Sequence, residues 1–228
     1  DGDSFDLSGT SEHIGYISDG LSENAFTSGN YFNGFANYGG TKASGKALGF
    51  AIENFGINDL SLDLLNNSPP VFLPYLCGER APLFDENARG VFFGINGGTT
   101  KRDMAYSVFE GVVFGLYDIF DRLGDSSGGR IKTGGGSSVN VFLNKLKAEI
   151  FGKEILVAKE TDSSALGAAM LAMLGAGEYS DINTCIQNEV GYAETFSPTG
   201  KYAEKFKKRF AIFRSLYKDL KEDFNNFD

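Results

Sequence analysis

Three consecutive glycines lie directly before an amphipathic segment in TGGGSSVNVFLNKLKAEIFG, residues 133–152. Phe142, Leu146 and Ile150 recur at four-residue spacing, which predicts a helix that begins at once after the glycines. The segment RIKT before the glycines and KEILVAK (153–159) after the helix are typical of strands. This order of strand, helix and strand favours an α/β fold over a flexible linker. The glycines then form either a tight turn or bare backbone on which a flat ligand lies.

The rest of the chain predicts further elements around this unit. Residues 4–10 and 12–18 alternate apolar and polar side chains, which predicts two strands joined through a Gly-Thr-Ser turn, and 24–40 predicts loop and strand. Helices are predicted at 41–56, 59–67, 101–123, 163–174 and within 199–227, and a short buried strand is predicted at 91–95. The first helix is expected to end at Gly56, and Ser163 or Ser164 is expected to cap the helix at 163–174. Gly111 and Gly115 predict close packing of the helix at 101–123 against a neighbour.

Together these elements predict a mixed sheet flanked by helices. Ligands of such sheets bind beyond the carboxyl ends of the strands, where the glycines at 134–136 would lie. The second glycine turn, LSGTSE (7–12), exposes backbone N–H groups and hydroxyls that suit phosphate oxygens, although a plain turn is the simpler interpretation. We expect no Walker loop, because no Lys-Ser/Thr pair follows the glycines.

Charge and composition exclude several function classes. A formal net charge of −9, from 30 acidic and 21 basic residues, argues against a nucleic-acid-binding face. With no signal peptide and no apolar run of membrane length, we expect a cytoplasmic protein without a membrane partner. His13 is the only histidine, which nearly excludes Ser/His/Asp triads and multi-histidine metal sites. Cys77 and Cys185 lack metal-ligand spacing, and a disulfide between them stays open.

Two charged segments have simpler and more specific interpretations. In GERAP (78–82), a structural ion pair between Glu79 and Arg80 is favoured over catalysis, and a phosphate or carboxylate contact from Arg80 is the alternative. The basic run KFKKR (205–209) is interpreted as a solvated helix face opposite the apolar stripe of the last helix.

Several segments, in the same order, resemble the FGGY carbohydrate kinases. The stretch GVFFGINGGTTKRDMAYSVFE (90–110) resembles the second signature of that family, and FLPYLCGERAP ahead of it is similar to another family segment. GGGSSVNVFLNKLKAEIFG is similar to the adenosine-binding loop and its helix, ALGAAMLA to a closing helix, and YAEKFKKRFAIFRSLY to the C-terminal helix. Asp162 departs from the pattern, since a glutamate is common there.

The resemblance implies an actin-like ATPase (ribonuclease H-like) fold, with 1–228 as the C-terminal, nucleotide-binding domain of a two-domain sugar kinase. It implies ATP and Mg²⁺ as cofactors and assigns ATP binding to Gly9, Thr10, Ser11, Gly135, Gly136 and Asn140. The sugar-binding domain and the catalytic aspartate are expected upstream of residue 1, so no catalytic or metal-binding residue is assigned here. Asp1, Asp3 and Asp6 lie too close to the first strand to be that aspartate. This half alone is expected to be inactive.

The resemblance leaves the substrate and the partners open. A ketopentose such as xylulose is the favoured sugar, bound through the absent N-terminal domain; gluconate or another polyol is the alternative. There are two competing hypotheses. One is a noncatalytic regulator of the same fold that binds nucleotide or sugar, and the other is a plain interaction module. A homodimer also stays open.

Overall fold

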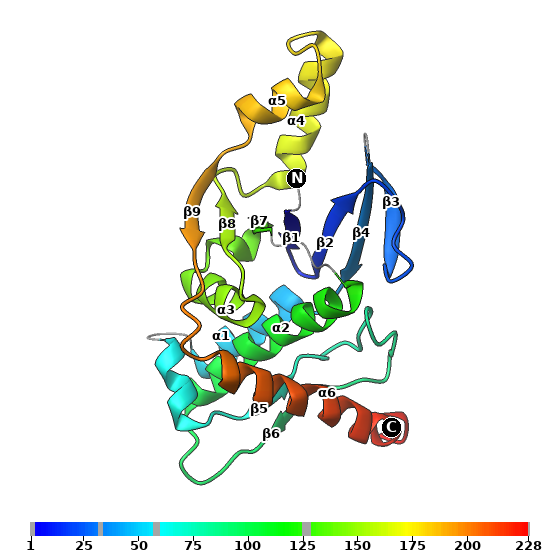
Figure 1. Ribbon diagram of the computed structural model, residues 1–228. Coiled ribbons are helices and arrows are strands. Elements are labelled where there is room, and N and C mark those ends of the chain that lie inside the picture. The colour runs from blue at the N-terminus through cyan, green and yellow to red at the C-terminus, as the bar shows by residue number, and fades with distance from the viewer. Residues whose placement is uncertain (1–2, 32–33, 57–59, 125–128, 228) are drawn as a thin grey trace.

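A computed structural model of the protein describes residues 3–31, 34–56, 60–124 and 129–227 (Figure 1). Within these residues, seven strands form one mixed sheet in the order β3-β4-β2-β1-β7-β8-β9. Only the β1–β7 and β7–β8 pairs of this sheet are parallel. The strands are β1 (Ser4–Ser8), β2 (Glu12–Ser18), β3 (Thr27–Tyr31), β4 (Gly34–Gly40), β7 (Ile131–Gly135), β8 (Ile155–Ala158) and β9 (Tyr192–Phe196).

Helices flank this sheet, which confirms the predicted architecture. They are α1 (Ser44–Phe55), α2 (Lys101–Leu123), α3 (Val141–Phe151), α4 (Ser163–Ala176), α5 (Ile182–Glu189) and α6 (Ala203–Asn225), with the 3-10 turns η1 (Leu62–Asn67) and η2 (Gly136–Val139). In Figure 1, α4 and α5 project beyond the sheet at the end opposite α6. No helix of the described residues is both long and apolar enough to cross a membrane.

Helix α2 occupies the predicted residues and lies at the centre of the core. Thr100 and Asp103 form a reciprocal capping box at its start, and Gly124 ends it in a left-handed conformation. A methyl group added at Gly111 would overlap the carbonyl oxygen of Phe72, so the predicted close packing is confirmed there. At Gly115 the nearest atom would lie 3.8 Å away, which is ordinary contact, and close packing at that position is not required.

Helix α6 covers α2 with its aromatic stripe. Phe206 and Phe213 are buried, and both rings contact Phe114 of α2. The basic run on this helix is only partly solvated, because Arg209 turns inward and forms a 2.5 Å ion pair with the buried Glu110. The interpretation of KFKKR as an entirely solvated face was therefore wrong at Arg209.

Some predicted details differ from the structure. The strand predicted at 91–95 is β6 (Val91–Phe93), which pairs with β5 (Val71–Leu73) in a separate two-stranded sheet. It is not buried, since Phe93 is 51% exposed. The cap of α4 is Asp162, whose side chain accepts from the amide of Ala165, rather than Ser163 or Ser164. Both cysteines are free thiols.

Candidate functional site

The parallel pairing of β1 with β7 brings two glycine loops to one edge of the sheet. Leu7 pairs with Gly134 and Ser8 with Gly135, so both strands end at the same level. The loop 9–11 that follows β1 and the loop 134–137 at the end of β7 therefore lie side by side. This is the position predicted from the sequence, beyond the carboxyl ends of the strands.

Loop 9–11 presents its backbone to solvent beside the start of α1. Gly9 and Thr10 are exposed, and the amide of Gly9 donates to the carbonyl of Ser11 at 2.9 Å. The amide of Gly45, in the first turn of α1, donates to the carbonyl of Gly9 at 3.2 Å. A methyl group at Gly45 would overlap that carbonyl, so the loop and the helix can meet only at a glycine. Backbone N–H groups of this loop and of the α1 N-terminus suit an anion such as phosphate.

The glycine loop has one strained and one open position. Gly135 has φ +96°, and a methyl group there would overlap the backbone of Ser8, so this glycine fixes the contact between β7 and β1. Gly136 is exposed, and a methyl group there would meet no atom within 4 Å. The space above Gly136 is therefore open to a ligand.

Asn140 caps the helix that follows the glycine loop. Its Oδ1 accepts a 2.9 Å hydrogen bond from the amide of Leu143 at the start of α3. This contact leaves the NH₂ group of the Asn140 side chain as the donor that could reach a ligand. The prediction that Asn140 contacts a nucleotide remains a prediction, but its structural role is defined.

A buried cluster of charges lies beneath both loops, and sequence reasoning missed it. The Nζ of Lys147, on α3, lies 2.5 Å from Asp6 Oδ2 and 2.6 Å from Glu12 Oε1. Each of these three side chains is at most 1% exposed. Burial, and then the nearby Glu12, raise the pKa of Asp6 to about 7. Burial alone would lower the pKa of Lys147, but the two carboxylates outweigh it and hold the pKa above its usual value.

A signal for this cluster exists in the sequence. Ser4, Asp6 and Ser8 share one face of β1, and all three are buried. A strand face made of small polar and acidic residues has to be satisfied from another element when it points inward. Lys147, which lies one residue from Leu146 in the apolar pattern of α3, is that partner.

Glu79 is bonded to backbone amides instead of forming the favoured side-chain ion pair with Arg80, and the alternative of a phosphate or carboxylate contact from Arg80 stays a prediction. The carboxylate of Glu79 accepts hydrogen bonds from the backbone amides of Lys42, at 2.6 Å, and Arg80, at 2.7 Å. It therefore holds its own loop to the segment before α1, and its contact with Arg80 is through the main chain. Burial raises the pKa of Glu79 to about 7. His13 is half-buried on β2 with its ring edge against Tyr38, as expected for a structural histidine.

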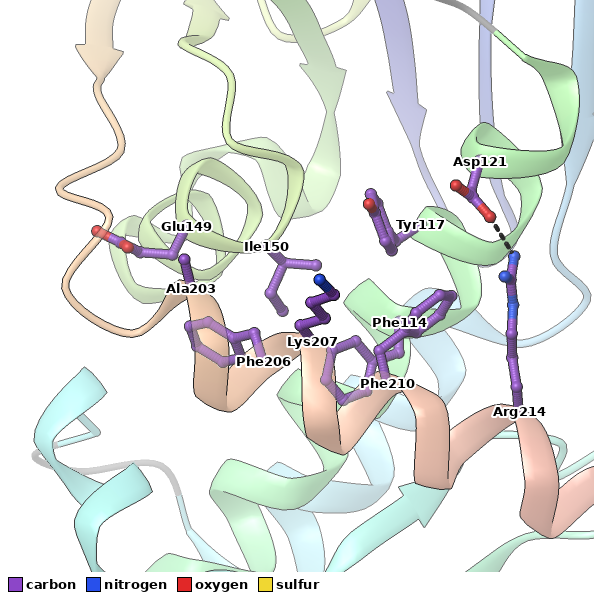
Figure 2. A pocket seen from close by; sticks show the side chains of 10 residues that line it. All are labelled: Phe114, Tyr117, Asp121, Glu149, Ile150, Ala203, Phe206, Lys207, Phe210 and Arg214. Carbon is purple, nitrogen blue, oxygen red and sulfur yellow. Dashed lines mark hydrogen bonds and ion pairs between the residues drawn. The ribbon is translucent and has the colours of Figure 1, made fainter.

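A cavity of about 320 Å³ lies elsewhere, between α2, α3 and α6 (Figure 2). Four aromatic rings and Ile150 line it, and Arg214 at its rim is paired with Asp121 at 2.6 Å. Ile150 belongs to the C-terminal end of α3, whereas Asn140 and the glycine loop lie at its N-terminal end. The cavity is therefore separate from the two loops.

Comparison with known proteins decides the family. A model of the C-terminal domain of the FGGY family of carbohydrate kinases matches residues 7–176, which include both loops and helices α1 to α4. The chain belongs to the FGGY family of carbohydrate kinases. It is 32% identical over 195 residues to a xylulose kinase of Staphylococcus epidermidis, covering 81% of this chain and 39% of that protein. It is 30% identical over 157 residues to a gluconokinase of Bacillus licheniformis, covering 68% of this chain and 30% of that protein.

Solved FGGY structures confirm the predicted actin-like fold. A ligand-bound xylulose kinase from Lactobacillus acidophilus matches with a TM-score of 0.85 and 28% identity, over 100% of this chain and 49% of that chain. A gluconate kinase from the same organism matches with a TM-score of 0.83 over the same shares. The FGGY chain thus spans about half the length of these solved relatives, and less of the curated ones.

Proposed function

We propose that this chain is the C-terminal, nucleotide-binding half of a two-domain kinase that transfers the γ-phosphate of ATP to a sugar hydroxyl. One observation carries the proposal: the matched FGGY segment contains two loops that the β1–β7 register places side by side. In this proposal the preceding half of the kinase supplies the sugar contacts and the aspartate that takes the proton of the sugar hydroxyl. The proposal also places the kinase in the cytoplasm, where ATP is available.

The two loops would divide the nucleotide between them. The backbone of Gly9 shapes this loop, and the Thr10 amide, the Thr10 and Ser11 hydroxyls and the first turn of α1 would bind phosphate oxygens. The adenine and ribose would lie over the open backbone of Gly136, next to Gly135, with the Asn140 amide as a polar contact. Mg²⁺ would enter with ATP and neutralise phosphate charge during transfer.

In this proposal the substrate is a ketopentose such as xylulose. The xylulose kinase match extends over 81% of the chain, and the gluconokinase match over 68% at slightly lower identity. Gluconate is therefore the alternative substrate. Both sugars carry several hydroxyls, so the choice depends on which hydrogen-bonding partners the preceding half presents.

The deciding experiment is ADP release by the complete kinase with Mg-ATP and a panel of xylulose, ribulose, gluconate and glycerol. Turnover on one sugar, with none from residues 1–228 alone, is the expected result. A folded complete protein that binds Mg-ATP but releases no ADP with any sugar would favour a noncatalytic regulator. A folded protein that does not bind Mg-ATP would refute the proposed nucleotide site.

A further inference from the structure

The Asp6, Glu12 and Lys147 side chains form a buried ionic cluster to which the proposed function assigns no role. They come from β1, β2 and α3, and the ammonium group of Lys147 bridges the two carboxylates at 2.5 and 2.6 Å. Removing three charges from water costs several kcal/mol for each ion, and replacing such clusters with apolar residues often stabilises a protein. A cluster of this kind at the base of a binding site therefore suggests a role other than stability.

The cluster is hydrogen-bonded to three backbone segments around the nucleotide loops. Glu12 Oε1 accepts a 2.8 Å hydrogen bond from Ser8 Oγ, and the same hydroxyl contacts Ser137 Oγ of the glycine loop. Glu12 Oε2 accepts from Ser44 Oγ, at the first residue of α1. One carboxylate thus links loop 9–11, loop 134–137 and the start of α1, and Lys147 holds that carboxylate in place.

We propose that Asp6, Glu12 and Lys147 are positioning residues that hold the two nucleotide loops and the α1 N-terminus in the arrangement that ATP requires. This inference rests on the proposed function. None of the three side chains can touch the nucleotide, because all are buried beneath the loops. Their contribution is to fix the backbone N–H groups before ATP binds, so that binding does not have to order them.

The charge of the cluster adds a feature that a purely structural role lacks. Asp6 Oδ2 accepts from Lys147 and, at 3.0 Å, from the Thr133 hydroxyl of β7, whereas Asp6 Oδ1 is buried without a hydrogen-bond partner. Two carboxylates face one ammonium group, so the cluster is neutral only when Asp6 holds a proton. A pKa of about 7 places this change within the working range of an enzyme.

The sign of the pH effect follows from the charge of the ligand. As pH rises through about 7, Asp6 loses its proton and the cluster gains a net negative charge beneath a loop that binds phosphates. ATP affinity should therefore fall as pH rises through this range. The groups that face Asp6 are Glu12 from β2, Lys147 from α3 and the Thr133 hydroxyl from β7. Replacing Asp6 with asparagine leaves one carboxylate and one ammonium group, so the cluster stays neutral between pH 6 and 9.

The first test compares Lys147→Met with Arg209→Met in the complete kinase. Both variants break a buried ion pair, but the pair of Arg209 with Glu110 joins α6 to α2, away from the loops. We expect Lys147→Met to raise the KM for Mg-ATP at least tenfold while the KM for the sugar changes little. Arg209→Met should lower the melting temperature and leave the KM for Mg-ATP unchanged. Equal effects of the two variants on the KM for Mg-ATP would overturn the inference.

The second test is the pH dependence of Mg-ADP binding by the parent and by Asp6→Asn, measured by calorimetry between pH 6 and 9. It keeps the inference testable if Lys147→Met does not fold, because Asp6→Asn removes no cation and changes no volume. We expect the ratio of the two affinities to change by several-fold across pH 7, with the variant binding more tightly at high pH. A constant ratio would contradict the inference. If the parent binds Mg-ADP, the proposed function stands whether the ratio changes or stays constant.

Discussion

Replacing Gly136 with valine is the sharpest test of where the nucleotide lies. Gly136 is exposed, its φ lies outside the left-handed region, and a methyl group there meets no atom within 4 Å. The fold therefore has room for the valine side chain. Removing a glycine also lowers the entropy of the unfolded chain, which favours folding by about 0.4–1 kcal/mol. We expect the melting temperature of Gly136→Val to equal that of the parent or to exceed it slightly.

The same side chain would occupy the space that we propose for the adenine ring. A ring resting on bare backbone lies about 3.5–4.0 Å from it, and valine adds carbon atoms within that distance. If about ten ring atoms each lose one or two contacts of roughly 0.1–0.2 kcal/mol, binding weakens by about 1–4 kcal/mol. This loss corresponds to a rise in Kd of about 5-fold to 900-fold.

Calorimetry with Mg-ADP on the complete kinase measures this change directly, with the KM for Mg-ATP as a second readout. Gly29→Val is the matched control, because Gly29 lies on β3 at the far edge of the sheet and also has no atom within 4 Å of an added methyl. Its affinity for Mg-ADP should equal that of the parent. A folded Gly136→Val variant with parental affinity for Mg-ADP would refute the placement of the adenine over Gly136.

Three further predictions concern stability. Gly135→Ala should lower the free energy of unfolding in urea by about 1–3 kcal/mol, because φ is +96° and the methyl group meets Ser8; parental stability would contradict this account. Asp162→Ala should lower the free energy of unfolding in urea by about 1 kcal/mol, because the cap of α4 is lost. Asp162→Asn should leave this free energy unchanged, because asparagine also caps helices. Glu79 has its pKa raised by burial from 4.5 to about 7, so its protonation contributes stability that is complete below about pH 4.5 and lost as pH rises through 7. Glu79→Gln should therefore stabilise the protein at pH 8, by about 3 kcal/mol at most, and have little effect at pH 5; an equal effect at both pH values would exclude this origin.

Local patterns predicted most of the architecture. The β1–β2 hairpin follows from two alternating segments around a glycine turn, and α2 follows from a long apolar period. Helix α5 and strand β9 were missed because both are short, with 8 and 5 residues. A helical period is established over a window of about 11 to 18 residues, and α5 is shorter than that.

The candidate site was only partly predictable for a different reason. The positions of Gly9 and Gly136 follow from glycine loops next to strands, and the sheet topology confirms that both loops share one edge. The polar face of β1 indicates that a partner is needed, but the sequence does not identify Lys147 as that partner, since a charged residue is by default expected on the surface. The partner becomes apparent only when the α3 helix is laid against the two strands.

The β1–β7 pairing also determines when the site can form during folding. Asp6 and Thr133 are 127 positions apart, so closing this chain segment costs about 4 kcal/mol of entropy before the two loops meet. Hairpins such as β1–β2 need only local contacts and can form much earlier. A nucleotide that needs both loops would therefore find no site on early folding species. We expect Mg-ADP to slow the unfolding of this domain and to leave its folding rate unchanged.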